Sequence, residues 1–142
     1  MPNAMSILIV DDDANVRNVF AAMLKPLKLL VIEAGNGIAG LALFREYRPS
    51  LVITDIIMPE MDGIELLREI RSIDPEAHIV AMSGGGGGRY SDPLALARDL
   101  GAAETLSKPV DVQKLRSTVT RLLQRTHEAR HTPEQYAPPV SA

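Results

Sequence analysis

The chain has 142 residues and a formal net charge of -3, with 46% hydrophobic and 23% charged residues. This length favours one domain, and the composition is ordinary for a globular protein. A nucleic-acid-binding surface usually carries a clustered basic excess, which the charge balance argues against. No cysteine is present to form disulfides or thiolate metal sites, and no apolar stretch is long enough to span a membrane. We therefore expect a cytoplasmic protein with no direct nucleic-acid partner and no membrane insertion.

Short apolar runs alternate with helical patterns along the chain. The apolar runs predict strands at residues 7–10, 29–32, 51–54 and 79–82, and a weaker run at 104–107 predicts a fifth. Apolar residues at helical spacing predict helices at about 16–24, 38–48, 64–74, 94–100 and 112–123. Five repeats of strand and helix predict an α/β fold with a doubly wound, five-stranded parallel sheet. The favoured strand order is 2-1-3-4-5, which is flavodoxin-like.

The helical patterns also predict which side chains face the sheet. In the first helix these are Val16, Val19, Phe20, Met23 and Leu24, and in the second they are Ile38, Leu41, Ala42 and Phe44. Residues 6–125 then form the domain, and residues 1–5 are expected to be a disordered lead-in. Residues 126–142 contain prolines and little apolar periodicity, so we expect a disordered tail there.

Acidic residues follow the first and third predicted strands. Asp11, Asp12 and Asp13 come directly after the first strand, and Asp55 follows the third. Ligands of an open α/β sheet bind outside the carboxyl ends of its strands, so we expect these acids to converge. Clustered carboxylates repel one another unless a cation lies between them, and their hard oxygen atoms suit magnesium. The sequence therefore predicts a Mg²⁺ site that includes Asp11 and Asp12.

Two further polar groups follow the fourth and fifth strands. Ser83 ends the fourth strand, and Lys108 follows the fifth. A carboxylate such as Asp55 can attack a phosphoryl donor while a metal ion, a lysine and a hydroxyl neutralise the phosphoryl oxygens. Taken singly, Asp55 is also suited to cap a loop, Ser83 to form a turn and Lys108 to lie on the surface. The Lys108-Pro109 bond is a candidate cis peptide.

Four motifs in a fixed order resemble those of one known family. They are Ile-Val-Asp-Asp-Asp at 9–13, Thr-Asp-Ile-Ile-Met-Pro-Glu-Met-Asp-Gly at 54–63, Met-Ser-Gly at 82–84 and Lys-Pro at 108–109. Each motif alone is common, whereas the ordered set at this spacing is specific. Over residues 6–125 the chain resembles the receiver domain of two-component response regulators, the CheY-like family.

The resemblance implies a role for each residue of the site. Asp55 is phosphorylated by a sensor histidine kinase or a histidine phosphotransfer protein, and Asp11, Asp12, Asp55 and the backbone carbonyl of Ile57 hold Mg²⁺. Lys108 pairs with one phosphoryl oxygen, and Ser83 donates a hydrogen bond to another. The implied function is a phosphorylation-activated switch that changes the binding of a downstream protein partner. Such a protein is not an enzyme beyond its own phosphorylation and dephosphorylation.

Two positions depart from the family pattern. Receivers often carry an aromatic residue three positions before the lysine, where this chain has Thr105. Five glycines, Gly84 to Gly88, lie where a switching loop is expected, so we predict a mobile segment that becomes more ordered on phosphorylation. The segment after the last helix is too short for a helix-turn-helix module, so we expect either output through contact with a protein or a role as a phosphate shuttle. A piece of a longer regulator would show the same pattern.

Two other functions compete with this interpretation. The run Asp11-Asp12-Asp13 also fits the Asp-x-Asp pattern of haloacid-dehalogenase-like phosphatases, in which Asp11 would be the nucleophile. That signature expects Thr or Val where this chain has Asn15. A pseudoreceiver that binds partners without phosphate is disfavoured, because the set of acids, hydroxyl and lysine is complete.

Overall fold

The computed structural model describes residues 5–84 and 90–135, with 127–135 described as backbone only. Parallel strands form one sheet in the order β2-β1-β3-β4-β5. The strands are β1 (Ser6–Val10), β2 (Leu30–Ala34), β3 (Leu51–Asp55), β4 (Ile79–Ser83) and β5 (Glu104–Ser107). The helices are α1 (Ala14–Leu24), the short 3-10 helix η1 (Lys25–Leu27), α2 (Gly37–Tyr47), α3 (Gly63–Ile73), α4 (Pro93–Asp99) and α5 (Val112–Gln135). The predicted doubly wound fold and its strand order are confirmed.

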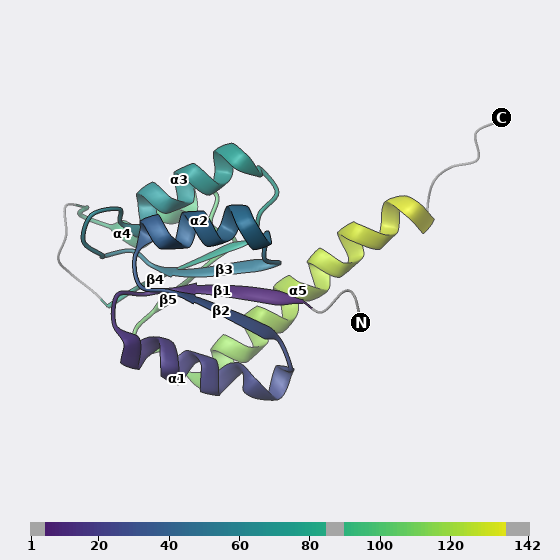
Figure 1. Ribbon diagram of the computed structural model, residues 1–142, viewed down its shortest axis with the longest axis horizontal. Coiled ribbons are helices and arrows are strands. Elements are labelled where there is room, and N and C mark those ends of the chain that lie inside the picture. Colours follow the sequence, from purple (N-terminus) through teal and green to yellow (C-terminus); the bar gives the residue numbers. More distant parts are fainter. Residues whose placement is uncertain (1–4, 85–89, 136–142) are drawn as a thin grey trace.

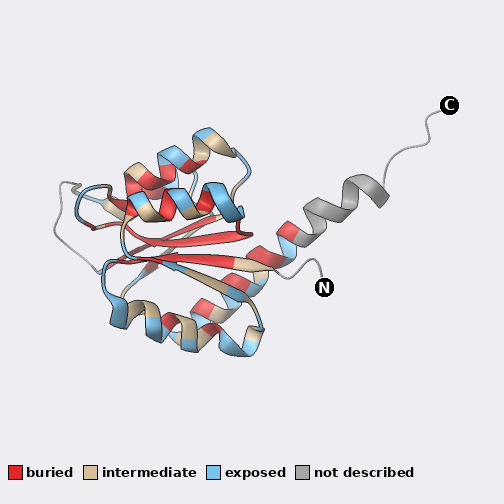
Figure 2. Cartoon of the chain, viewed as in Figure 1, coloured by how far each residue is buried: buried red, intermediate tan, exposed pale blue. Residues whose placement is uncertain are grey.

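Helices cover both faces of the sheet (Figure 1). Successive strand residues point to opposite faces, so Leu8 and Val52 join a core beneath α2, α3 and α4. Ile9 and Ile53 join a second core beneath α1 and α5. Figure 2 shows the central strands largely buried: every residue of β3 and β4 is buried, as is every residue of β1 after Ser6. Burial on both faces explains why these strands read as continuous apolar runs.

Polar side chains fix where four of the helices begin. Asp13, Asn36, Asp62 and Asp92 each accept a hydrogen bond from a backbone N–H in the first turn of the following helix. Asp62 forms a capping box, because it accepts from the Glu65 N–H at 2.9 Å while the Glu65 carboxylate accepts from the Asp62 N–H at 3.0 Å. These helix starts lie at the same end of the sheet as the polar strand ends, so the caps fix the loops that border the site.

The inward face of α2 differs from the prediction. Ile38 is 55% exposed and Ala42 is also exposed, whereas Gly37, Gly40, Leu41 and Phe44 are buried. A Cβ atom on Gly40 would lie 3.0 Å from Val10 Cγ2, and one on Gly37 would lie 2.4 Å from the Met61 carbonyl oxygen. The helix thus turns its glycines inward to approach the sheet and the loop before α3. On α1, Val19 is likewise exposed, while the predicted core residues Phe20 and Leu24 are buried.

The two ends of the domain also differ from the prediction. Met5 does not belong to a disordered lead-in, because its carbonyl accepts from the Leu30 N–H at 3.1 Å. Helix α5 continues past the predicted end at Leu123, through residues 126–135 of the predicted tail. Each further helical residue adds one backbone hydrogen bond, so a helix that is already formed extends through polar sequence without an apolar stripe. The predictions for residues 1–4 and 136–142 lie outside the described residues. In the described part of the chain, no helix could cross a membrane.

Candidate functional site

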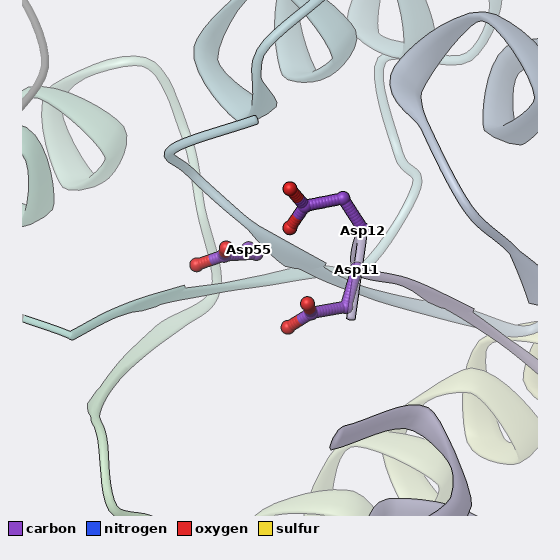
Figure 3. Close-up of side chains that lie close together, drawn as sticks. All are labelled: Asp11, Asp12 and Asp55. Carbon is purple, nitrogen blue, oxygen red and sulfur yellow. The ribbon is translucent and has the colours of Figure 1, made fainter. Parts of the chain in front are cut away.

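Three carboxylates meet at the carboxyl end of the sheet. Strands β1 and β3 are neighbours with Val10 opposite Thr54, so the next residues, Asp11 and Asp55, lie side by side. Asp11, Asp12 and Asp55 each offer an oxygen atom, and these atoms all lie within 4.8 Å of one another. Figure 3 shows the three side chains converging from the two strand ends. Asp11 and Asp55 are buried, whereas Asp12 is exposed.

Lys108 brings a positive charge to these carboxylates. Its ammonium group lies 2.8 Å from Asp11 Oδ2 and 3.5 Å from Asp55 Oδ1. Its backbone N–H donates to the Ser83 carbonyl at 2.8 Å, which holds the lysine beside the end of β4. The Lys108-Pro109 bond is cis, as the sequence suggested. The residues predicted from the ends of the first, third and fifth strands are therefore brought together.

Burial and charge set the ionisation of Asp55 and Lys108. Burial raises the pKa of Asp55 from 3.8 to about 6; the charge of Lys108 opposes this rise, and those of Asp11 and Asp12 add to it. Burial alone would lower the pKa of Lys108. Its hydrogen bond to Asp11 and the charges of Asp55 and Asp11 outweigh burial and raise the pKa of Lys108 above 10.5. Lys108 is therefore positively charged. It lies beside the Asp55 carboxylate, whose ionised form is destabilised by burial.

The backbone around Asp11 is held by Arg17. The guanidinium Nη1 of Arg17 donates to the Asp11 carbonyl at 2.6 Å, and its Nε pairs with Glu33 at 3.2 Å. The Asp13 N–H donates to Asp11 Oδ1 at 2.9 Å. These contacts fix the peptide that carries Asp12. Arg17 was not predicted as a site residue. Its position in the first turns of α1, four residues after the Asp13 cap, is the signal that the sequence offers for a contact with the preceding loop.

The backbone after Asp55 is packed against the start of α3. The Gly63 N–H donates to the Ile56 carbonyl at 2.8 Å, and a Cβ atom on Gly63 would lie only 2.3 Å from the Asp55 carbonyl oxygen. Only glycine leaves room for this approach. Ile57, the predicted backbone ligand, lies half-buried in the loop between Asp55 and Gly63. The loop therefore begins at Asp55 and returns to it at Gly63.

Ser83 lies at the end of β4 and is buried. Beside it, a cavity of about 300 Å³ separates the end of β4 and Lys108 from the residues that begin α4. Gly84 is described and exposed, whereas the predictions for Gly85 to Gly88 lie outside the described residues. Thr105, at the position where receivers often have an aromatic residue, accepts a hydrogen bond from Arg98 of α4 at 2.6 Å.

Comparison with known proteins identifies the family. The sequence profile described as "Response regulator receiver domain" matches residues 7–120. The chain belongs to the response regulator receiver family. The fold and the cluster of aspartates at the carboxyl end of its sheet agree with this membership. The chain is therefore a receiver domain of two-component response regulators, and the phosphatase and pseudoreceiver alternatives are not favoured.

Individual relatives share the receiver region over different fractions of their length. The chain is 32% identical over 117 residues to sporulation initiation phosphotransferase F of Bacillus subtilis, covering 82% of this chain and 92% of the relative. It is 37% identical over 124 residues to the transcriptional regulatory protein ZraR of Klebsiella oxytoca, covering 86% of this chain but 27% of that protein. A crystal structure of a receiver domain protein from Clostridium thermocellum matches with a TM-score of 0.81 and 31% identity, covering 88% of this chain and 98% of that one. The matched region is thus nearly a whole protein in one relative and a quarter of another.

Proposed function

We propose that Asp55 accepts a phosphoryl group from a phosphohistidine of a sensor histidine kinase or a histidine phosphotransfer protein. The observation that carries this proposal is the Asp55 carboxylate 3.5 Å from the Lys108 ammonium, with oxygens of Asp11 and Asp12 within 4.8 Å. In the reaction, an Asp55 carboxylate oxygen attacks phosphorus and forms a P–O bond. The P–N bond breaks, and its electron pair returns to the imidazole, which takes up a proton.

The carboxylates fit a magnesium ion. Three oxygen donors within 4.8 Å of one another match the hard ligands that Mg²⁺ prefers, and Asp12 is exposed on the solvent side. Asp11, Asp12, Asp55 and the Ile57 carbonyl would hold the ion. When bound, Mg²⁺ supplies positive charge that neutralises phosphoryl oxygens during transfer.

Lys108 and Ser83 complete the proposed phosphoryl site. Lys108 exchanges its contact with the carboxylates for one with a phosphoryl oxygen, which supplies charge without a change in protonation. The Ser83 hydroxyl donates to another phosphoryl oxygen. The same groups support hydrolysis, in which water attacks phosphorus, the P–O bond to Asp55 breaks, and the carboxylate is restored as inorganic phosphate leaves. We infer that the protein catalyses only its own phosphorylation and dephosphorylation.

A groove beside the site supports a protein as the phosphoryl donor. It measures about 530 Å³ and lies between α1 and the segment after β5. Its walls include Val16, Val19, Phe20 and Met23 on one side and Lys108, Pro109 and Val110 on the other. An exposed apolar residue such as Val19, which is 50% exposed, suits contact with a protein surface. The name of the Bacillus relative, a phosphotransferase, agrees with transfer of a phosphoryl group.

We infer that a downstream protein partner binds the phosphorylated and unphosphorylated forms differently. A cytoplasmic location stays a prediction. The test is intact-mass measurement after incubation with Mg²⁺ and an acyl phosphate. We expect one added phosphoryl group on the wild type, none on Asp55→Asn, and none without Mg²⁺. Asp11→Asn should retain slow incorporation, because the nucleophile is still present. Labile phosphate on Asp55→Asn and none on Asp11→Asn would instead make Asp11 the nucleophile.

A further inference from the structure

A hydrogen bond between two loops lies near the phosphoacceptor and takes no part in the proposed chemistry. The Tyr90 hydroxyl donates to Asp62 Oδ2 at 2.9 Å. Tyr90 precedes α4, which begins at Pro93, and Asp62 caps the start of α3. Asp62 is buried, and Tyr90 packs against the core beneath α2, α3 and α4. The bond therefore joins the start of α4 to the start of α3.

Asp62 is linked to the phosphoacceptor through its neighbour Gly63. Gly63 packs against the Asp55 carbonyl, and its N–H donates to Ile56 at 2.8 Å. The capping box with Glu65 fixes the Asp62 side chain relative to this first turn. A displacement of the backbone after Asp55 is therefore transmitted to Asp62, because no space separates the two segments.

Free volume lies beside residues 91–94, which directly follow Tyr90. The cavity of about 300 Å³ lies between residues 91–94 and a wall that includes Ser83, Ser107 and Lys108. Helix α4 contacts α3 on one side and β5 on the other. A movement of residues 91–94 into this cavity would bring them toward Ser107 and Lys108, which form its opposite wall. Because Tyr90 directly precedes these residues, such a movement would pull its hydroxyl away from Asp62.

The far end of α4 is anchored more firmly. Arg71 of α3 donates to the Gly101 carbonyl, just after α4, and Arg98 donates to Thr105 of β5 at 2.6 Å. Among the seven residues of α4, only Ala97 is buried. The helix is thus held at its C-terminal end and packed shallowly along its length, so its N-terminal end can move with little loss of buried surface.

We propose that the Tyr90–Asp62 hydrogen bond is a latch that holds the unphosphorylated state and that phosphorylation of Asp55 opens it. This inference rests on the proposed function. The phosphoryl group draws Ser83 and the start of α4 toward Lys108, and Tyr90 moves with residues 91–94. The surface formed by Tyr90 and the N-terminal end of α4 then differs between the two states.

A contact made in one state only biases the equilibrium between states, and the bias is reciprocal. Removing the Tyr90 hydroxyl must therefore favour the phosphorylated state. We expect Tyr90→Phe to bind a phosphoryl mimic about tenfold more tightly than wild type, a change that corresponds to about 1.4 kcal/mol. Asp62→Asn keeps an oxygen for the helix cap but weakens the acceptor, so it should shift binding in the same direction.

The experiment is a titration of metal-saturated protein with beryllofluoride, followed through the Glu65 amide in ¹⁵N spectra. Wild type, Tyr90→Phe, Asp62→Asn and the control Tyr47→Phe are compared, since Tyr47 is exposed on α2, away from the site. Tighter binding of beryllofluoride by Tyr90→Phe and Asp62→Asn, with unchanged binding by Tyr47→Phe, supports the latch. A role in stability alone lowers the melting temperature and leaves the dissociation constant unchanged, which overturns the proposal.

The result for the wild-type protein distinguishes failure of the proposed function from failure of the latch alone. If wild type binds no beryllofluoride and takes up no phosphate, the proposed function fails and the latch fails with it. If wild type binds and Tyr90→Phe binds equally tightly, the proposed function stands and only the latch is rejected. Weaker binding in Tyr90→Phe would also reject it, because the bond would then belong to the phosphorylated state.

Discussion

At the scale of single residues, the site balances three carboxylates against one lysine. Lys108 lies close to Asp11 and Asp55, whereas Asp12 faces solvent. The charge of Asp55 is still costly, since burial raises its pKa to about 6. A second cation at this place lowers that cost and makes the carboxylate available as a nucleophile. The electrostatics of the metal-free protein therefore favour both protonation of Asp55 and uptake of a cation.

The raised pKa of Asp55 predicts how the stability of the metal-free protein changes with pH. Folded protein keeps a proton on Asp55 at pH values where the unfolded chain has lost it, so this group stabilises the fold below about pH 4. That contribution is lost as the pH rises through about 6. From about pH 5 to about pH 8 the loss should be about 1 kcal/mol in the free energy of unfolding.

Urea unfolding in the presence of a chelator measures this effect. Asp55→Asn serves as the reference, because it removes this one titrating group and retains the others. The gain in stability of Asp55→Asn over wild type should be larger at the higher pH. An equal difference at both pH values would show that Asp55 titrates alike in the folded and unfolded chains.

The site residues differ in how far the sequence could predict them. Asp11 and Lys108 each follow a strand and Asp55 ends one, and the topology of a parallel sheet brings strand ends together whatever the details of packing. Arg17 and Tyr90 act through side chains that reach across to other elements. Their partners depend on helix orientation and rotamer, which a linear pattern of apolar and polar residues does not contain.

At the scale of elements, the first residue of α3, Gly63, packs against the backbone of Asp55. Gly63→Ala would place a Cβ atom 2.3 Å from the Asp55 carbonyl oxygen and 2.7 Å from Ile56 Cα. The loop must then move, and we expect a loss of about 1–3 kcal/mol in the free energy of unfolding together with weaker Mg²⁺ binding. Gly35→Ala is the matched control, because its nearest neighbour would be Arg17 Nη1 at 3.5 Å. Denaturant unfolding and metal titration of both variants test this, and equal effects would contradict it.

Helices were predictable where the spacing of apolar residues and the length of the segment both indicated a helix. In α3, for example, Ile64, Leu67 and Ile70 are buried as expected. The pattern failed on α2, where Ile38 is exposed and Gly40 faces the sheet. Hydrophobicity ranks isoleucine above glycine for burial. The approach of α2 to Val10 depends instead on the absence of a side chain, a tertiary property that hydrophobic periodicity does not register.

At the scale of the whole molecule, metal binding and folding are linked. The carboxylates that would bind Mg²⁺ come from β1 and β3 and meet only in the folded chain. A ligand that binds only the folded state adds about 2.7 kcal/mol of stability at a concentration one hundred times its dissociation constant. Magnesium should therefore raise the melting temperature of the wild-type protein.

Asp12→Ala should abolish most of this rise. It should also leave the metal-free protein as stable as wild type or more so, because one source of repulsion among the carboxylates is gone. Glu69→Ala is the control, since Glu69 is an exposed acid on α3. Thermal melts with Mg²⁺ and with a chelator compare the three proteins. A full magnesium response in Asp12→Ala would exclude Asp12 from the metal site.

The two described ends of the chain lie on the side of the molecule opposite the carboxylates, and the end of α5 projects beyond the sheet (Figure 1). Strand β1 starts on that side with Ser6, and α5 runs back toward it from its start at Val112 (Figure 1). A protein module or label joined at either described end would therefore be attached on the side away from the aspartates, and it would leave their approach from solvent open.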